Sequence, residues 1–329
     1  MSTSPIDGGS DTPNLPAIQK LLGPFKISAI QFWLRARKLP YSAVGRDEIA
    51  KRVFESVDKK KLTYSDLVDG LIGIEESKSK TVHLVRVADD KHFASKVDKQ
   101  LADLKTPLAA SRTLATVQST TPKLIYAINN AKQFRMKWGE TQTSVKLDKK
   151  TFEPVKVSMP VIFVFVLDKS TGVGQLRYEA PQMIHSHKVD GEIRQQAYFD
   201  FYKEKCENMT GLAFEPLDLR ERLKELLLKQ PPVVVPVTMS TIGEDEQTVV
   251  YGSRTPADPR TLKDFKSAMT KDAQPRTFEK APLRWQHQMT NYKLYRNLWC
   301  SIDGAAGTVF FDADCTEDEV DYVISETIQ

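Results

Sequence analysis

Hydrophobic residues recur at intervals of three and four positions through the first quarter of the chain, which is the spacing of helices with one buried face. The clearest series are Ile27, Ile30 and Leu34, then Ile49, Val53 and Val57, then Leu67, Leu71 and Ile72. Pro24, the Leu39-Pro40 step and the lysines at 59–61 interrupt the series. Residues 15–73 are therefore predicted to form four short helices. The Ser-, Asp-, Gly- and Pro-rich residues 1–14 are predicted to be a disordered tail.

The period then changes to two, which is typical of strands. Residues 81–87 alternate in this way. Apolar and polar residues also alternate over residues 133–138. This alternation predicts a strand with an apolar face, formed by Phe134, Met136 and Trp138, and a polar, basic face, formed by Gln133, Arg135 and Lys137. Strands at 159–168 and 174–179 are joined by the turn residues 169–172 and form a predicted hairpin. Residues 93–116 are predicted to be helical, with a break near Pro107.

The last third of the chain mixes both periods. Helices are predicted at 191–209, 217–229, 262–269 and 317–327, strands at 233–239, 248–251, 294–302 and 308–312, and irregular chain at 273–287. Thr316 and Glu319 form a T-x-x-E capping box at the start of the last helix. The turn 303–307 joins the last two strands.

These elements predict an α+β fold, in which a small N-terminal helical bundle precedes a domain with a mainly antiparallel sheet. The expected organisation is a tail at 1–14, a helical module at 15–78 and an α+β domain at 79–329. Residues 159–207 and 294–328 both read as a hairpin followed by a helix, so the α+β domain can be divided into two hairpin–helix halves.

Composition narrows the class of protein. The 329 residues are 40% hydrophobic and 27% charged, as in ordinary globular proteins. The longest apolar run, residues 161–167, is far shorter than the ~20 residues of a membrane-spanning helix, and the polar start of the chain lacks the features of a secretory signal. Three widely spaced cysteines argue against a disulfide framework. We expect an intracellular protein, cytoplasmic or in the nucleus or nucleoid, without membrane association.

Charge is distributed unevenly. Residues 1–150 carry 26 Lys and Arg against 16 Asp and Glu, whereas residues 151–329 carry 21 against 27. Within the basic half, residues 26–61 hold ten Lys and Arg against four acids. Such asymmetry is typical of a chain in which one half binds a polyanion, although lysine-rich surface helices also occur without that role.

Motifs for catalysis and cofactors are scarce. Residues 169–174 contain glycines but lack the spacing of a phosphate-binding loop, and no nucleophile elbow is present. His185 and His187 are spaced to begin a metal site, which Asp190, Glu192 or Cys206 would complete. Asp303, Asp312 and Asp314 gather around the last hairpin, where a metal-dependent nuclease would hold Mg²⁺, yet turns and helix starts favour acids for structural reasons. We expect no enzyme, cofactor or metal, and buried structural roles for Cys206, Cys300 and Cys315.

Residues 27–53 resemble the SAP-type helix–extended–helix module that binds DNA. The resemblance is carried by Leu34, Leu39-Pro40, Ser42, Gly45-Arg46, Glu48-Ile49 and Arg52-Val53. In that family the first helix and the start of the second contact DNA, which implies contacts by Arg37, Lys38, Ser42, Gly45 and Arg46 here. The chemistry suits a phosphate, because glycine permits close approach and a helix N-terminus with a neighbouring arginine binds anions. The glycine stands one or two positions later than the family pattern.

The whole arrangement is similar to centromere protein N. A basic helical bundle precedes the strand that contains Phe134, Trp138 and Gly139, and long antiparallel strands follow. That family joins a death-fold-like helical domain to an α+β domain and reads nucleosomes and DNA. The similarity supports association with nucleic acid and transfers no site residue.

The sequence therefore predicts a non-enzymatic nucleic-acid-binding protein, with DNA favoured, whose acidic C-terminal half serves partner contacts or self-association. The expected contact residues are Lys26, Arg35, Arg37, Lys38, Ser42, Gly45, Arg46, Lys51, Arg52, Arg135 and Lys137. Trp33 and Tyr41 lie among them as potential stacking residues, although burial in the core is the more frequent role of such a tryptophan. The alternatives are an adaptor whose basic half docks an acidic partner and a divergent metal-dependent nuclease.

Overall fold

The structure is a computed structural model, which describes residues 13–77, 80–88, 91–103, 108–115, 119–147, 153–179, 188–229, 233–242, 248–252, 258–261, 277–291 and 293–328. The N-terminal helical module comprises α1 (Leu15–Leu22), α2 (Ile27–Ala36), α3 (Arg46–Asp58) and α4 (Tyr64–Ser77). Asn14 begins α1, because its side-chain oxygen accepts a hydrogen bond from the Ala17 amide at 3.0 Å. The predicted bundle of four short helices is confirmed.

The core of the helical module follows the predicted apolar positions. Ile30, Leu34, Ile49, Val53 and Leu67 are all fully buried in it. α2 crosses α4 at Trp33 and Gly70, where a Cβ atom on Gly70 would lie 2.1 Å from the indole ring. The absence of a side chain at Gly70 is therefore what lets the two helices pack this closely.

The rest of the described chain is built on one twelve-stranded sheet, in which all the strand pairs are antiparallel. Its strand order is β2-β3-β4-β5-β1-β12-β11-β10-β8-β9, with β6 beside β1 and β7 beside β10. The strands are β1 (Lys80–Val87), β2 (Lys123–Asn129), β3 (Gln133–Leu147), β4 (Pro154–Asp168), β5 (Val173–Glu179), β6 (Phe214–Pro216), β7 (Val234–Pro236), β8 (Thr238–Ile242), β9 (Thr248–Gly252), β10 (Thr277–Trp285), β11 (Leu298–Asp303) and β12 (Thr308–Phe311). The predicted α+β class, with N-terminal helices before a mainly antiparallel sheet, is confirmed.

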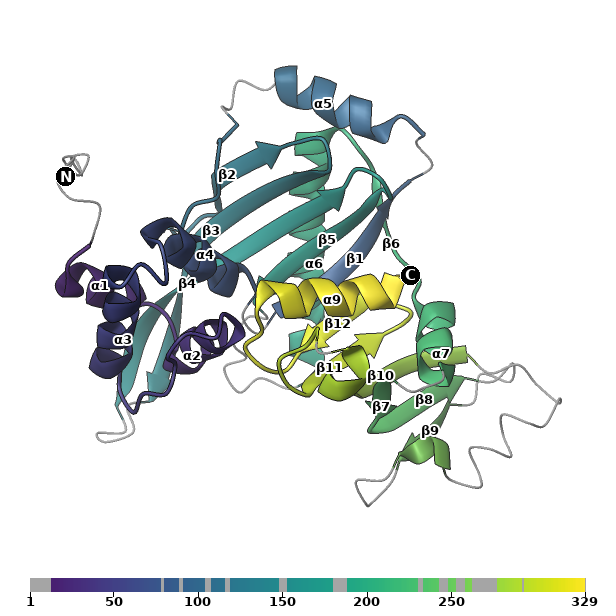
Figure 1. Cartoon of the computed structure of the whole chain (residues 1–329). Coiled ribbons are helices and arrows are strands. Elements are labelled where there is room, and N and C mark those ends of the chain that lie inside the picture. The colour runs from purple at the N-terminus through teal and green to yellow at the C-terminus, as the bar shows by residue number, and fades with distance from the viewer. Residues whose placement is uncertain are drawn as a thin grey trace.

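The helices outside the N-terminal module cover opposite faces in the two halves of this sheet (Figure 1). The further helical elements are α5 (Phe93–Asp103), α6 (Lys188–Thr210), α7 (Arg220–Leu228) and α9 (Glu317–Ile328), with short 3-10 turns at Pro259–Thr261 and His287–Thr290. α5 and α6 pack with the Phe134, Met136 and Trp138 side of β3. α7 and α9 pack on the other face, over β10, β11 and β12. β1 lies between the halves and contributes to both cores.

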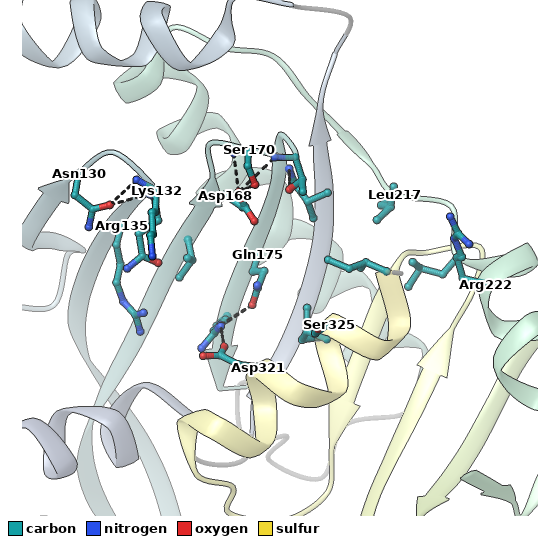
Figure 2. Close-up of a pocket in the computed structure, with 18 of the residues that line it drawn as sticks. Asn130, Lys132, Arg135, Asp168, Ser170, Gln175, Leu217, Arg222, Asp321 and Ser325 are labelled. Atoms are coloured by element: carbon teal, nitrogen blue, oxygen red, sulfur yellow. Dashed lines mark hydrogen bonds and ion pairs between the residues drawn. The ribbon is translucent and has the colours of Figure 1, made fainter. Parts of the chain in front are cut away.

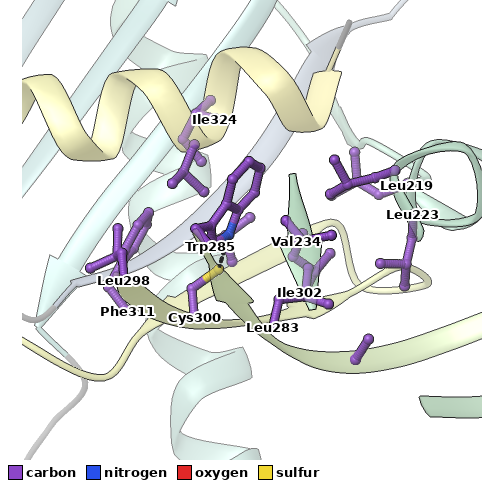
Figure 3. Close-up of a cluster of buried hydrophobic side chains, with 14 of the residues drawn as sticks. Leu219, Leu223, Val234, Leu283, Trp285, Leu298, Cys300, Ile302, Phe311 and Ile324 are labelled. Carbon is purple, nitrogen blue, oxygen red and sulfur yellow. Dashed lines mark hydrogen bonds between the residues drawn. The ribbon is translucent and has the colours of Figure 1, made fainter. Parts of the chain in front are cut away.

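The core beneath α7 and α9 is centred on Trp285 (Figure 3). Its indole N–H points at the Cys300 sulfur at 3.0 Å, and both residues are buried. α9 begins at the predicted capping box: the Thr316 amide donates to Glu319 at 3.0 Å, and the Glu319 amide donates to the Thr316 hydroxyl at 3.2 Å. The sequence signal and the observed cap agree.

Some predicted elements differ from the structure. The helix expected over 93–116 ends at residue 103, and the described residues 108–115 are not helical. The chain expected to be irregular over 273–287 contains the central strand β10. The strand expected from residue 294 begins at Leu298. The helix predicted at 262–269 and the tail at 1–12 lie outside the described residues.

Candidate nucleic-acid interface

Basic side chains of the helical module gather around a shallow depression of about 450 Å³. Lys38 follows α2, Arg52 lies on α3, and Lys61 lies in the turn between α3 and α4. Tyr41 and Ser42 lie in the extended segment between them, and no carboxylate lines the depression in the described part of the chain. Three elements thus converge to give a small surface with basic side chains, which we call the basic depression; of these, Arg52 also pairs with Glu48 at 2.7 Å.

Backbone geometry places Lys38 at this surface. Its φ of 56° lies in the left-handed region that glycine usually occupies after a helix. This conformation ends α2, and the Leu39 amide then donates back to the Leu34 carbonyl at 3.0 Å. Lys60, in the next turn, has a φ of 54°. Lysine is an unfavourable choice for either position, and unfavourable backbone conformations are often retained at functional sites.

The two aromatic residues of this region have different roles. Tyr41 is 40% exposed, and the guanidinium of Arg35 lies 5.7 Å from its ring centroid. Trp33 is only 3% exposed and packs in the helical core, while Arg37 covers its ring at 4.6 Å. Tyr41 is therefore accessible to a ligand, whereas Trp33 is a core residue.

Other expected contact residues lie apart from the basic depression. Arg46 donates to the carbonyls of Leu22 and Gly23 at 2.8 and 2.7 Å, so its guanidinium caps the end of α1. Lys26 pairs with Asp314 at 3.3 Å. Lys51 is exposed on α3, outside the lining of the depression.

The start of α3 does not have the geometry expected of a phosphate site. Gly45 has an extended backbone with a φ of −141°, and a Cβ atom placed on it would meet nothing within 4 Å. The Glu48 carboxylate accepts a hydrogen bond from the Val44 amide at 2.9 Å. Asp47 and Glu48 also place two negative charges in the first turn of the helix. These acids already stabilise the positive end of the helix dipole, which lessens its attraction for an anion.

Arg135 and Lys137 do not extend an exposed basic surface, which corrects that expectation. Both side chains are buried, because the helical module packs over this face of β3. Arg135 pairs with Glu76 of α4 and with Glu317 of α9, the latter at 2.8 Å. Lys137 pairs with Glu75 and with Glu76, the latter at 3.3 Å. A phosphate could reach neither cation without separating these elements.

The buried charges form one network around Glu76. Arg112 joins it by donating to Glu76 at 2.7 Å and to Glu317 at 2.8 Å, and the Tyr126 hydroxyl donates to Glu76 at 2.7 Å. Burial opposes the charge on Glu76, yet the cations of Arg135, Lys137 and Arg112 outweigh it and lower the pKa of Glu76 from 4.5 to about 2. The network therefore stays ionised and fastens the helical module to the sheet.

A groove of about 1010 Å³ lies on the sheet face beside α9 (Figure 2). Lys132 and Arg222 lie on its rims, and Asp321 and Ser325 of α9 form one wall. In the groove, Arg177 donates to Asp321 at 2.5 Å. Carboxylates and cations both line this groove, so it does not favour a polyanion in the way the basic depression does.

Two of the three aspartates that sequence analysis considered for a metal-dependent nuclease, Asp303 and Asp314, take structural roles. Asp303 accepts from the Ala306 amide at 3.0 Å and holds the last turn, while Asp314 pairs with Lys26. His185 and His187 lie outside the described residues. In the part of the chain that the structure describes, no three His, Cys, Asp or Glu side chains are arranged to hold a metal ion. No described helix has the length and apolarity needed to cross a membrane.

Sequence reasoning missed Lys61, because the lysines at 59–61 indicate by themselves only the end of a helix. Its position directly after an amphipathic helix was the available signal, since the turn brings it back toward Lys38. Sequence reasoning also missed Arg112 and Glu76, whose partners are distant in sequence. In comparisons with known proteins, the chain matches no protein-family model and no curated protein significantly.

Proposed function

We propose that this protein binds nucleic acid without catalysis, DNA in the first instance, by contacting phosphates with the basic depression. The observation that carries the proposal is the convergence of Lys38, Arg52 and Lys61 around an exposed Tyr41, with no carboxylate in the lining in the described part of the chain. Lysine and arginine side chains neutralise phosphates and release bound counterions, which drives association at low salt. An exposed aromatic ring beside them adds a surface on which a base or sugar can pack.

The left-handed backbone at Lys38 supports the same function. A lysine there is held at a position that a glycine would occupy with less strain. Its side chain lines the depression. Folding alone would favour glycine at this position, so a lysine there is better explained by a role of its cation in binding. The acidic C-terminal half would then serve partner contacts or self-association.

The test is fluorescence anisotropy with labelled duplex DNA, single-stranded DNA and RNA across ~50 to 300 mM salt. The variant pair Lys38→Glu and Lys61→Glu should weaken binding and reduce the slope of the log–log salt dependence by about one for each phosphate that is no longer neutralised. Lys99→Glu on α5 is the control, because it makes the same charge change on an exposed lysine elsewhere.

The variant Lys38→Gly distinguishes an effect on nucleic-acid affinity from an effect on protein stability. Glycine tolerates the left-handed conformation, so this variant should fold at least as well as the wild-type protein while binding less tightly. Unchanged affinity in Lys38→Glu/Lys61→Glu would contradict the proposed surface. Absence of binding at the lowest salt would contradict the function, and would favour the alternative in which the basic half docks an acidic protein.

A further inference from the structure

One face of the sheet carries aromatic residues and is left open by the helices in the described part of the chain. Among β10, β11 and β12, directly paired residues share a face, and the pairings Arg284 with Trp299 and Ser301 with Phe310 place these four on the same side. The opposite side holds Leu283, Cys300 and Phe311 in the core under α7 and α9. We call the side with Lys280, Arg284, Trp299, Ser301 and Phe310 the open sheet face.

Exposure of the open sheet face increases toward β9. Thr81 of β1, which pairs with Phe310, is buried, and Phe310 itself is half-buried. Trp299 is 45% exposed, and Val250 of β9 is 65% exposed. A single exposed apolar residue is ordinary, whereas a group of them with polar residues around it commonly marks a binding surface. Phe310 and Val250 lie on the same face as Trp299.

The two rings are spaced for successive ligands. Trp299 is two residues from Ser301, which lies opposite Phe310, so the rings occupy a diagonal position on neighbouring strands. The Cα atoms of diagonal neighbours on one face lie ~7–8 Å apart. That separation suits two groups that are splayed apart along an extended chain.

A cation accompanies each ring. Arg284 lies 5.9 Å from the Trp299 ring centroid, and Lys280 lies 5.6 Å from that of Phe310. Asp303 approaches Lys280 at 3.9 Å, which is a loose pair on an exposed surface and leaves the ammonium available. Aromatic rings with adjacent cations are the combination that binds single strands, because bases stack on the rings while phosphates meet the charges.

We propose that the open sheet face binds single-stranded nucleic acid by stacking unpaired bases on Trp299 and Phe310. Duplex nucleic acid is not the expected ligand, because its bases present no free faces. An acidic protein would satisfy the cations and leave the paired rings without a specific role. The site lies on the face of β10–β12 opposite α7 and α9, and it shares no residue with the basic depression.

Tryptophan fluorescence gives a direct readout. Trp33, Trp138 and Trp285 are buried, so collisional quenching by acrylamide reports mainly on Trp299. Addition of unlabelled oligo(dT) or oligo(rU) of about 15 nucleotides should protect this tryptophan from acrylamide. An abasic oligonucleotide of the same length carries the phosphates without the bases and should protect it much less.

Trp299→Ala should weaken single-strand affinity by about five- to 100-fold, measured by anisotropy, whereas Trp299→Phe should retain most of it. Phe201→Ala is the matched control, because Phe201 is an exposed aromatic on α6 with Lys205 over its ring at 4.6 Å. Comparison of the affinities for oligo(dT) and oligo(rU) shows whether the site prefers DNA or RNA.

Three outcomes would overturn the proposal: equal protection by the abasic strand, unchanged affinity in Trp299→Ala, or protection of Trp299 that rises with protein concentration alone. The last would identify the face as a self-association surface. Lys38→Glu/Lys61→Glu should weaken duplex binding and leave the protection of Trp299 by oligo(dT) intact, so this site and the basic depression can fail independently.

Discussion

Glu76 of α4 and Arg135 of β3 form an ion pair that is almost completely removed from solvent. The pair joins the helical module to the sheet, and Glu317 of α9 shares the same guanidinium at 2.8 Å. Three segments that are far apart in the sequence therefore meet at one arginine. Loss of either partner would leave the other charge buried without compensation.

Glu76→Gln should consequently lower the free energy of unfolding by ~3–5 kcal/mol, the usual effect of breaking a buried pair. Urea denaturation measures this. Glu55→Gln is the control, because Glu55 forms an exposed pair with Lys59 on α3, and its loss should cost about 0.5 kcal/mol or less. Similar costs for the two variants would show that the buried network contributes no more than a surface pair.

Acid should destabilise the protein in two separate windows. Burial lowers the pKa of His83 from 6.5 to about 4, so the unfolded chain takes up a proton in this range that the folded chain does not, and stability falls as pH decreases from 6.5 to 4. The lowered pKa of Glu76 acts in the same direction between 4.5 and about 2. Stability curves measured across pH should flatten in the upper window for His83→Gln and in the lower one for Glu76→Gln. An unchanged slope in His83→Gln would contradict the upper assignment.

Gly70→Ala should disrupt the helical module. The added Cβ would lie 2.1 Å from the Trp33 ring, so α2 and α4 must separate, at a cost of at least ~1–3 kcal/mol. Gly45→Ser is the comparison, because that backbone is extended and the space around it is open. Serine caps helices slightly better than glycine, so a gain of about 0.3 kcal/mol is expected. Thermal melts distinguish the two, and a tolerated Gly70→Ala would refute the close contact.

Arg46→Ala should affect stability and leave nucleic-acid affinity nearly unchanged. Its guanidinium donates to two carbonyls at the end of α1, and such charged hydrogen bonds contribute ~1.5–3 kcal/mol. Hydrogen exchange of the α1 amides should accelerate in the variant. A large loss of DNA affinity with normal exchange would return Arg46 to the DNA-contacting role implied by the SAP-type resemblance.

The three cysteines should be unreactive in the folded protein. Cys206, Cys300 and Cys315 are buried, and burial raises the pKa of Cys300 to about 12, against a smaller opposing effect of the Trp285 hydrogen bond. Because the thiolate is the reactive species, an aromatic disulfide reagent should label none of them until denaturant is added. Rapid labelling of native protein would mean that the core around Trp285 opens readily.

The strand at 133–138 shows which features of the structure could be predicted from the sequence and which could not. Alternation predicted the strand and identified Arg135 and Lys137 as the polar face, both correctly. It could not predict that this face is buried, because the charges that permit burial, Glu75 and Glu76, lie about 60 residues earlier in the chain. Charge pairing across such distances has no periodic signal. The basic depression was partly predictable, since Lys38 and Arg52 flank a recognisable turn.

The strand β10 was not predicted, and it contains Pro282, although proline normally argues against a central strand. In the structure Pro282 sits where the neighbouring strand breaks between β7 and β8, and its carbonyl accepts from the Val237 amide at 2.9 Å. No amide is needed from residue 282 at that point. A gap in the partner strand, which the sequence does not reveal, makes the proline acceptable.

The position of β1 between the two halves of the sheet has a consequence for synthesis of the chain. β1 follows directly after the helical module, yet its neighbour β12 comes some 225 residues later. Until residues 308–311 leave the ribosome, the part of β1 from Thr81 to His83 has one open edge that can pair with other chains. Val82 and Leu84 also belong to a core that is complete only when α9 has been made. The nascent protein must therefore be protected from aggregation for most of its synthesis, and truncation before β12 should yield insoluble material even though the helical module is complete.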